Sequence, residues 1–95
     1  MIHITAVIKA KPDTVQALTD IFKPLVEATR MEEGCKRYDL HQVMNEATTF
    51  IMMEEWQSQE SIDKHNQSAH FQQFVADAKP LLAEPLQAYF TEQVL

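Results

Sequence analysis

Residues 35–56 have the sequence CKRYDLHQVMNEATTFIMMEEW, in which two runs of strand-forming residues flank a polar break at Met44–Ala47. The break contains Asn45, a residue type that favours turns. β-Branched, aromatic and long apolar side chains recur along both runs, which is typical of strands. The stretch therefore predicts a β-hairpin whose strands are Cys35–Gln42 and Thr48–Trp56.

A turn confined to Met44–Ala47 pairs Val43 with Thr48, and the same register places Arg37 opposite Glu54. Opposing side chains share one face of a hairpin, so Arg37 and Glu54 are expected to form a cross-strand pair. That face mixes aromatic and ionisable groups, as small-molecule sites do. Its predicted members are Cys35, Arg37, Asp39, His41, Phe50, Met52, Glu54 and Trp56. The other face is mostly apolar, and Tyr38 is expected to be a core residue there.

Hydrophobic periodicity predicts the elements before the hairpin. Ile2–Lys9 alternates with a period of two, which indicates a strand. From Thr14 to Thr29 apolar residues recur every three or four positions, which indicates a helix that Pro24 should kink. Asp13 is expected to cap its start, and Gly34 to end it in a left-handed conformation.

After the hairpin, Ser58 is expected to cap a short helix that reaches about His65. A second helix carries Phe71, Phe74, Val75 and Ala78 on one stripe, and residues 86–93 are extended. The order strand, helix, strand, strand, helix pair, strand predicts a ferredoxin-like α+β fold with four antiparallel strands and helices on one face. Because helices cover only one face, the other is expected to meet a second copy in a homodimer.

The length, composition and net charge limit the classes of protein to which this chain can belong. A length of 95 residues predicts one domain, residues 1–95, and 45% hydrophobic residues are ordinary for a globular chain. The net charge of −6 with scattered lysines and arginines argues against nucleic-acid and anionic-membrane partners. Cys35 is the only cysteine, and the start of the chain does not resemble a signal peptide, so we expect a cytoplasmic protein.

Three segments carry a family resemblance. Glu32–His41 resembles an E-x-G-C-x-x-Y-x-L segment, Phe50–Ser58 resembles F-x-x-x-E-x-W-x-S, and His65–Phe71 resembles H-x-x-x-x-H-F. In this order and spacing they are similar to the antibiotic biosynthesis monooxygenase family. The resemblance implies a dimeric ferredoxin-like domain, a dimeric alpha-beta barrel, with a small-molecule pocket beside each sheet.

The family includes cofactor-independent quinol and anthrone monooxygenases, haem-degrading enzymes and the isomerase of phosphorylated autoinducer-2. Haem degradation is disfavoured here because Thr5 stands where that branch has an asparagine. The leading hypothesis is a cofactor-independent monooxygenase that uses dioxygen on a quinol-like or polyphenolic substrate. An isomerase of a small phosphorylated metabolite and a non-catalytic dimeric binding module stay open as alternatives. Gly34 is the only glycine, so no glycine-rich loop for a nucleotide or flavin cofactor is expected.

Two residues are candidates for catalysis. A neutral His65 could remove a proton from a phenolic or enolic hydroxyl, although it could also be a histidine packed at a helix end. Glu54 could act as a second acid or orient His65, and its plainer role is the pair with Arg37.

Other residues are candidates for substrate binding. Trp56, Phe50 and Met52 could form the pocket wall or simply belong to the core, with Asp39 as a polar partner. His70 is expected at the pocket rim; no metal site is expected, because its spacing from His65 is poor and no third ligand is evident. Cys35 is better explained as a small buried hydrophobe than as a nucleophile.

Overall fold

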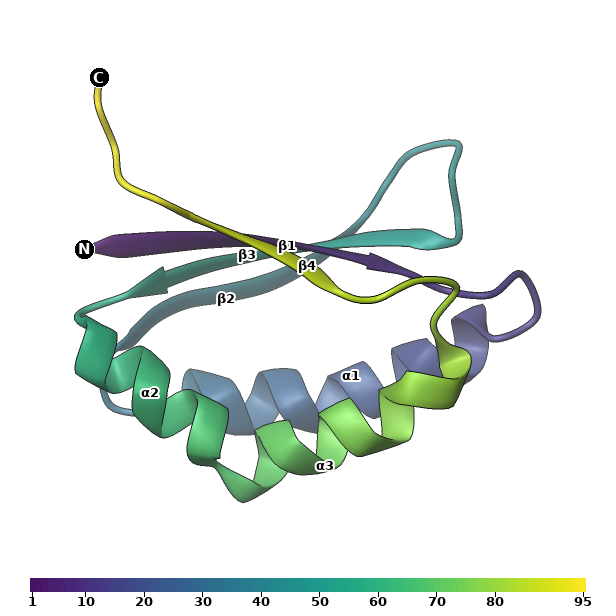
Figure 1. The fold of residues 1–95 in the computed structure, drawn as a ribbon, viewed down its shortest axis with the longest axis horizontal. Coiled ribbons are helices and arrows are strands. Elements are labelled where there is room, and N and C mark those ends of the chain that lie inside the picture. The colour runs from purple at the N-terminus through teal and green to yellow at the C-terminus, as the bar shows by residue number, and fades with distance from the viewer.

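The computed structural model describes residues 1–95 as two layers, a sheet and a layer of helices (Figure 1). The elements in chain order are β1 (Ile2–Lys9), α1 (Val15–Arg30), β2 (Cys35–Gln42), β3 (Thr49–Trp56), α2 (Gln59–Gln67), α3 (Ala69–Ala78), the 3-10 turn η1 (Lys79–Leu81) and β4 (Gln87–Thr91). The strand order is β2-β3-β1-β4, and every neighbouring pair is antiparallel. The ferredoxin-like prediction is therefore confirmed.

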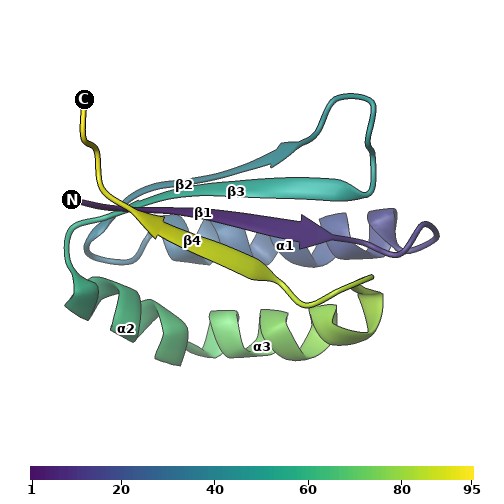
Figure 2. The same ribbon diagram turned by 45° about the horizontal axis from the view of Figure 1, so that its top comes forward.

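All helices lie on the same side of the sheet, as Figure 2 shows. The sheet is open, with β2 and β4 at its edges, so the expected barrel is not supported. None of the helices is long and apolar enough to cross a membrane. The other face of the sheet is left without a covering layer within this chain.

The core lies between the two layers. In β1 the predicted alternation is confirmed, because Ile4, Ala6 and Ile8 are buried against the helices. From α1 the buried residues Leu18, Phe22, Leu25 and Thr29 face the sheet at helical spacing. β1 and α1 thus each bury the face that their periodicity predicts.

The start of α1 differs from the prediction. Thr14, not Asp13, occupies the cap position, and its side chain makes no capping bond. Instead, the Thr14 hydroxyl donates to the carbonyl oxygen of Leu81 at 2.7 Å, which ties the helix start to η1. The helix runs through Pro24 as one element.

The register of the β2–β3 hairpin differs from the predicted register. Val43 N–H donates to the carbonyl oxygen of Thr49, so the turn is one residue longer than predicted, and Asn45 adopts a left-handed conformation within it. A bulge between Cys35 and Arg37 restores the predicted pairing of Cys35 with Trp56. The pairing Val43–Thr48 and the pairings predicted for Arg37 to Gln42 are wrong, because turn and bulge each insert a residue that periodicity does not reveal.

This shift redistributes the two faces of the hairpin. Tyr38 pairs with Glu54, and Leu40 with Met52, on the face toward the helices. Arg37 pairs with Glu55 instead of Glu54, on the uncovered face. The predicted Arg37–Glu54 ion pair therefore does not exist.

The two short helices after β3 begin at serine caps. The Ser58 hydroxyl accepts a hydrogen bond from the backbone N–H of Ser61, and the Ser68 hydroxyl accepts one from Phe71. The Ser68 hydroxyl also donates to the carbonyl oxygen of His65 at 2.7 Å, which fixes the bend between α2 and α3. This bend places His65 and His70 on adjacent turns of different helices.

Gly34 has the predicted left-handed conformation, with φ of 91°, although it lies beyond the helix end, before β2. A Cβ at this position would clash with Oγ of Ser61. We expect Gly34→Ala to lower the free energy of unfolding by about 3 kcal/mol, because backbone strain and a steric clash combine. Urea unfolding followed by circular dichroism measures this loss.

Asn45→Ala is the control, since Asn45 also has positive φ but lies exposed in the hairpin turn. It should cost only about 1 kcal/mol. Equal losses for the two variants would show that the contact with Ser61 does not matter.

Candidate active site

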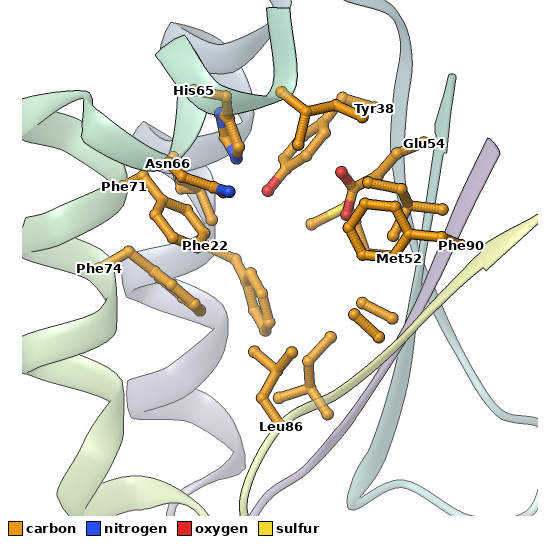
Figure 3. A pocket seen from close by; sticks show the side chains of 16 residues that line it. Phe22, Tyr38, Met52, Glu54, His65, Asn66, Phe71, Phe74, Leu86 and Phe90 are labelled. Atoms are coloured by element: carbon orange, nitrogen blue, oxygen red, sulfur yellow. The ribbon is translucent and has the colours of Figure 1, made fainter. Parts of the chain in front are cut away.

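A cavity of about 90 Å³ lies between the inner face of the sheet and the helices (Figure 3). Most of its lining is apolar: Ile4, Ala6, Ile8, Phe22, Leu25, Tyr38, Met52, Glu54, Ile62, His65, Asn66, Phe71, Phe74, Leu86, Ala88 and Phe90. Leu86 and Phe90 are 39% and 55% exposed. The cavity therefore opens along β4, the edge strand.

Polar groups gather at one end of this cavity. Tyr38, Glu54, His65 and Asn66 point into it from three elements, whereas Phe22, Phe74 and Leu86 lie toward the other end (Figure 3). This is the usual plan of a small-molecule site, with an apolar body and a few converging polar groups.

Glu54 is a buried carboxyl group on β3, only 9% exposed. The indole N–H of Trp56 donates to its Oε1 at 2.8 Å. Burial raises the pKa of Glu54 from 4.5 to about 7, and the bond from Trp56 opposes that rise. Near neutral pH this carboxyl can therefore either give or take a proton.

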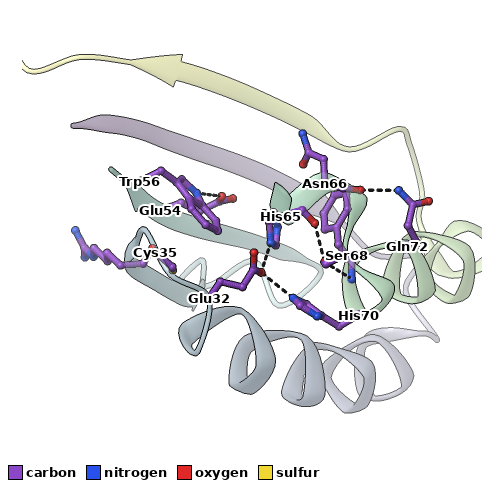
Figure 4. A network of polar contacts seen from close by, with 11 residues as sticks. Glu32, Cys35, Glu54, Trp56, His65, Asn66, Ser68, His70 and Gln72 are labelled. Carbon is purple, nitrogen blue, oxygen red and sulfur yellow. Dashed lines mark hydrogen bonds and ion pairs between the residues drawn. The ribbon is translucent and has the colours of Figure 1, made fainter. Parts of the chain in front are cut away.

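His65 lies at the end of α2 and is held from behind by Glu32. Its Nδ1 is 2.7 Å from Oε2 of Glu32, and Nε2 of His70 is 2.7 Å from the same oxygen (Figure 4). A carboxylate oxygen accepts hydrogen bonds, so both rings donate to it. His65 Nε2 is then left with its lone pair, on the ring edge away from Glu32.

The surroundings of His65 keep its ring neutral. Burial lowers the pKa of His65, and the hydrogen bond to Glu32 only partly offsets this effect. Rings of Trp56 and Phe71 pack against it at centroid distances of 4.8 and 4.7 Å. A neutral, oriented imidazole beside an apolar cavity can act as a general base.

The residues singled out from the sequence fall into three groups. His65, Glu54 and Met52 line the cavity together. Trp56 and Phe50 are buried next to this region, at 0% and 4% exposure, but do not line the cavity. Trp56 acts on the site through its contacts with Glu54 and His65.

Asp39 lies outside the cavity, on the uncovered face of the sheet. There it accepts hydrogen bonds from Arg37 at 2.9 Å and from Arg30 at 3.1 Å. The bond from Arg37, the larger influence, lowers the pKa of Asp39. The expected polar role of Asp39 in the pocket is wrong because the register shift reversed its face.

His70 also lies outside the cavity lining, and it reaches His65 only through Glu32. Cys35 is half-buried, and burial, followed by the charge of Glu32, raises the pKa of its thiol to about 11. A thiol that stays protonated at neutral pH is a poor nucleophile, which agrees with the interpretation of Cys35 as a small hydrophobe.

Sequence reasoning missed three residues of this site. Tyr38 is 4% exposed and lines the cavity, and burial raises the pKa of its hydroxyl, which therefore stays protonated. Asn66 lies at the cavity rim. Glu32 is the third; its place in the segment Glu32–His41 was the only available signal, and nothing in the sequence linked it to His65.

The raised pKa of Glu54 predicts a pH-dependent stability. Between about pH 4.5 and pH 7 the unfolded chain loses this proton while the folded chain keeps it, so Glu54 makes the fold less stable as the pH rises. In Glu54→Gln this contribution is absent. Relative to the wild type, the variant should gain about 2–3 kcal/mol of unfolding free energy between pH 5 and pH 8.

Urea unfolding at both pH values measures this difference, and comparison with the wild type removes the opposing contribution of His65. Glu46→Gln is the matched control, because Glu46 is exposed in the hairpin turn. A Glu54→Gln curve parallel to that of the wild type would contradict the raised pKa.

Comparisons with known proteins agree with this fold. The family model described as antibiotic biosynthesis monooxygenase matches residues 1–77. A Bacillus subtilis (strain 168) protein named "Putative monooxygenase YcnE" is 41% identical over 92 residues, which cover 97% of both proteins.

Solved structures give the same result. The structure of "Putative antibiotic biosynthesis monooxygenase from Nitrosomonas europaea" matches all of both chains with a TM-score of 0.96; at 20% identity it supports the fold alone. The protein PA3566 from Pseudomonas aeruginosa is 29% identical, with a TM-score of 0.93 over 99% of this chain and 94% of its own. The family match covers most of the chain, and the chain thus belongs to the antibiotic biosynthesis monooxygenase family.

Proposed function

We propose that this chain is a cofactor-independent monooxygenase that oxidises a small quinol with dioxygen. The observation that carries the proposal is the pairing of a neutral, oriented His65 with the protonatable Glu54 around one apolar cavity. The family membership supports the same class of reaction.

His65 Nε2 takes the proton of a substrate hydroxyl, and the resulting phenolate is electron-rich enough to react with dioxygen. The substrate supplies the electrons. One oxygen atom enters the ring, the other leaves as water, and the quinol becomes a hydroxyquinone. Glu54 and the Tyr38 hydroxyl lie where they can donate hydrogen bonds to substrate oxygens, and Met52 with Phe22 forms the wall.

The size of the cavity favours a substrate with one ring. A cavity of roughly 150 Å³ holds benzene in another protein, and the volume here is about 90 Å³ with an open side along β4. Because the enclosed volume is smaller than that, a single ring fits if part of it extends into the open side past Phe90. A polycyclic substrate would have to displace Leu86 and Phe90.

An isomerase is the second candidate. Two proton-transfer groups, His65 and Glu54, line the same cavity, as proton transfer between two carbons requires. No lysine or arginine lines the cavity, however, so a phosphate group would find no cationic partner. A phosphorylated substrate is therefore disfavoured relative to a neutral phenol.

We also propose that two copies associate through the uncovered face of the sheet and β4. Tyr89 on that face is 54% exposed, and the following segment ends with Val94 and Leu95 at 85% and 105% exposure. Figure 1 shows this segment extending away from the body of the chain. Size-exclusion chromatography with light scattering should give twice the mass of one chain.

Oxygen uptake with a panel of hydroquinones tests the function. We expect uptake by the wild type that His65→Ala reduces about 1,000-fold, because loss of the base removes proton abstraction. Turnover that persists under nitrogen would favour the isomerase. Tight binding of aromatic ligands without turnover, unchanged in His65→Ala, would instead indicate a binding module.

A further inference from the structure

Glu32 is a largely buried carboxylate without a permanent cationic partner. Its side chain is 15% exposed, and its only ion-pair contacts are with His65 and His70. No lysine or arginine pairs with it. A largely buried carboxylate without a lysine or arginine beside it is a group whose charge a metal cation would compensate.

The three groups also form a ligand set. One carboxylate oxygen and two imidazole nitrogens lie within 4.8 Å of one another. They come from the loop after α1, the end of α2 and the first turn of α3, so the bend at Ser68 brings them together (Figure 4). Two imidazoles with one carboxylate bind zinc and related divalent transition metals.

To admit an ion, Glu32 must move back and the two imidazole nitrogens, which lie within 4.8 Å of each other, must approach one another. Bonds of roughly 2.0–2.2 Å in a tetrahedral site hold ligand atoms roughly 3.3 Å apart, whereas each nitrogen lies 2.7 Å from the Glu32 oxygen. Glu32 would move back slightly. The side chain of His70 is 28% exposed, so its ring can turn, and water can reach the remaining coordination position.

We propose that Glu32, His65 and His70 bind a divalent transition-metal ion, and that its binding switches the cavity-facing nitrogen of His65 from acceptor to donor. The hydrogen on His65 Nδ1 moves to Nε2 and the hydrogen on His70 Nε2 moves to Nδ1, which frees one lone pair on each ring for the ion and keeps both rings neutral. His65 then donates a hydrogen bond into the cavity and no longer accepts a proton. The consequence for turnover rests on the proposed function; the binding site does not.

Titration of the full chain with Co²⁺, after dialysis against a chelator, tests the site. We expect visible ligand-field absorption that saturates at one ion per chain and is displaced by Zn²⁺. His70→Gln and Glu32→Gln should weaken Co²⁺ binding more than about 100-fold. Removal of a group that only hydrogen-bonds to a ligand lowers metal affinity by about 10- to 100-fold, and removal of the ligand itself should lower it more. His41→Gln is the matched control, because His41 is exposed and distant in the fold.

Absence of saturable Co²⁺ binding, or equal binding by wild type and His70→Gln, would overturn the metal site. Glu32, His65 and His70 would then be only a hydrogen-bonded group. Long-range ¹H–¹⁵N correlation spectra test the switch without turnover. They should show the His65 hydrogen on Nδ1 in the metal-free chain and on Nε2 with Zn²⁺; an unchanged tautomer would overturn the switch.

Oxygen uptake separates this proposal from the proposed function. Zn²⁺ should inhibit the wild type at least about tenfold, and His70→Gln should be resistant relative to its own metal-free rate. If no quinol is oxidised, the proposed function fails. The Co²⁺ titration and the ¹H–¹⁵N spectra of His65 still test the metal site in that case. If quinols are oxidised but Zn²⁺ has no effect, the inhibitory role of the metal fails.

Discussion

Glu32→Gln is expected to oxidise quinols about 1,000-fold more slowly than the wild type, with little change in stability. The carboxylate of Glu32 holds Nδ1–H of His65 and stabilises the imidazolium that forms when Nε2 takes a proton. A glutamine amide can present N–H to Nδ1 and favour the opposite tautomer. In a Ser-His-Asp triad, the corresponding change of acid to amide costs about 10,000-fold.

Steady-state oxygen uptake over a range of pH measures this effect. The loss should fall on kcat rather than on KM, because Glu32 does not line the cavity. The pKa that governs the basic group should also decrease, since the variant lacks the negative charge that favours His65 protonation.

Glu33→Gln is the matched control, because it removes the same charge from an exposed neighbour. It should retain the wild-type rate. Glu32→Asp should recover part of the activity, since a shorter carboxylate can still accept from Nδ1. A Glu32→Gln variant with an unchanged pH profile would show that Glu32 does not position His65.

The fold could be predicted from the sequence because it depends on local periodicity. The strand bounds Ile2–Lys9 and Cys35–Gln42 match the predicted ones, and the division of the segment after the hairpin into two helices was predicted as well. The register of the hairpin could not be predicted from the sequence. A turn one residue longer than expected and a compensating bulge both depend on packing, and periodicity is almost unaffected by either.

The candidate site was predictable only in part for the same reason. His65 and Glu54 were singled out through their chemistry and the family resemblance, yet the partner assigned to Glu54 was wrong by one residue in the register. Glu32 lies 33 positions from His65 along the chain, and their contact exists only because α2 and the loop after α1 meet. Sequence spacing carries no information about such a contact.

Trp56→Ala is expected to be the most destabilising substitution in the chain, at about 3–5 kcal/mol. Trp56 is fully buried, and its indole packs against the rings of His65 and Tyr38. A loss of this size approaches the total stability of a small domain. We expect the variant to be largely unfolded at 37 °C, as measured by circular dichroism and urea unfolding.

Trp56→Phe separates packing from hydrogen bonding. Phenylalanine keeps most of the buried ring but cannot donate to Oε1 of Glu54. The cost should fall to about 1–2 kcal/mol, and the pKa of Glu54 should rise above its wild-type value of about 7, because the bond that opposes burial is lost. Carboxyl ¹³C shifts followed by NMR over pH report that pKa. An unchanged pKa would mean that Trp56 supports the site by packing alone, whereas a rise would show that its indole N–H tunes the proton affinity of Glu54.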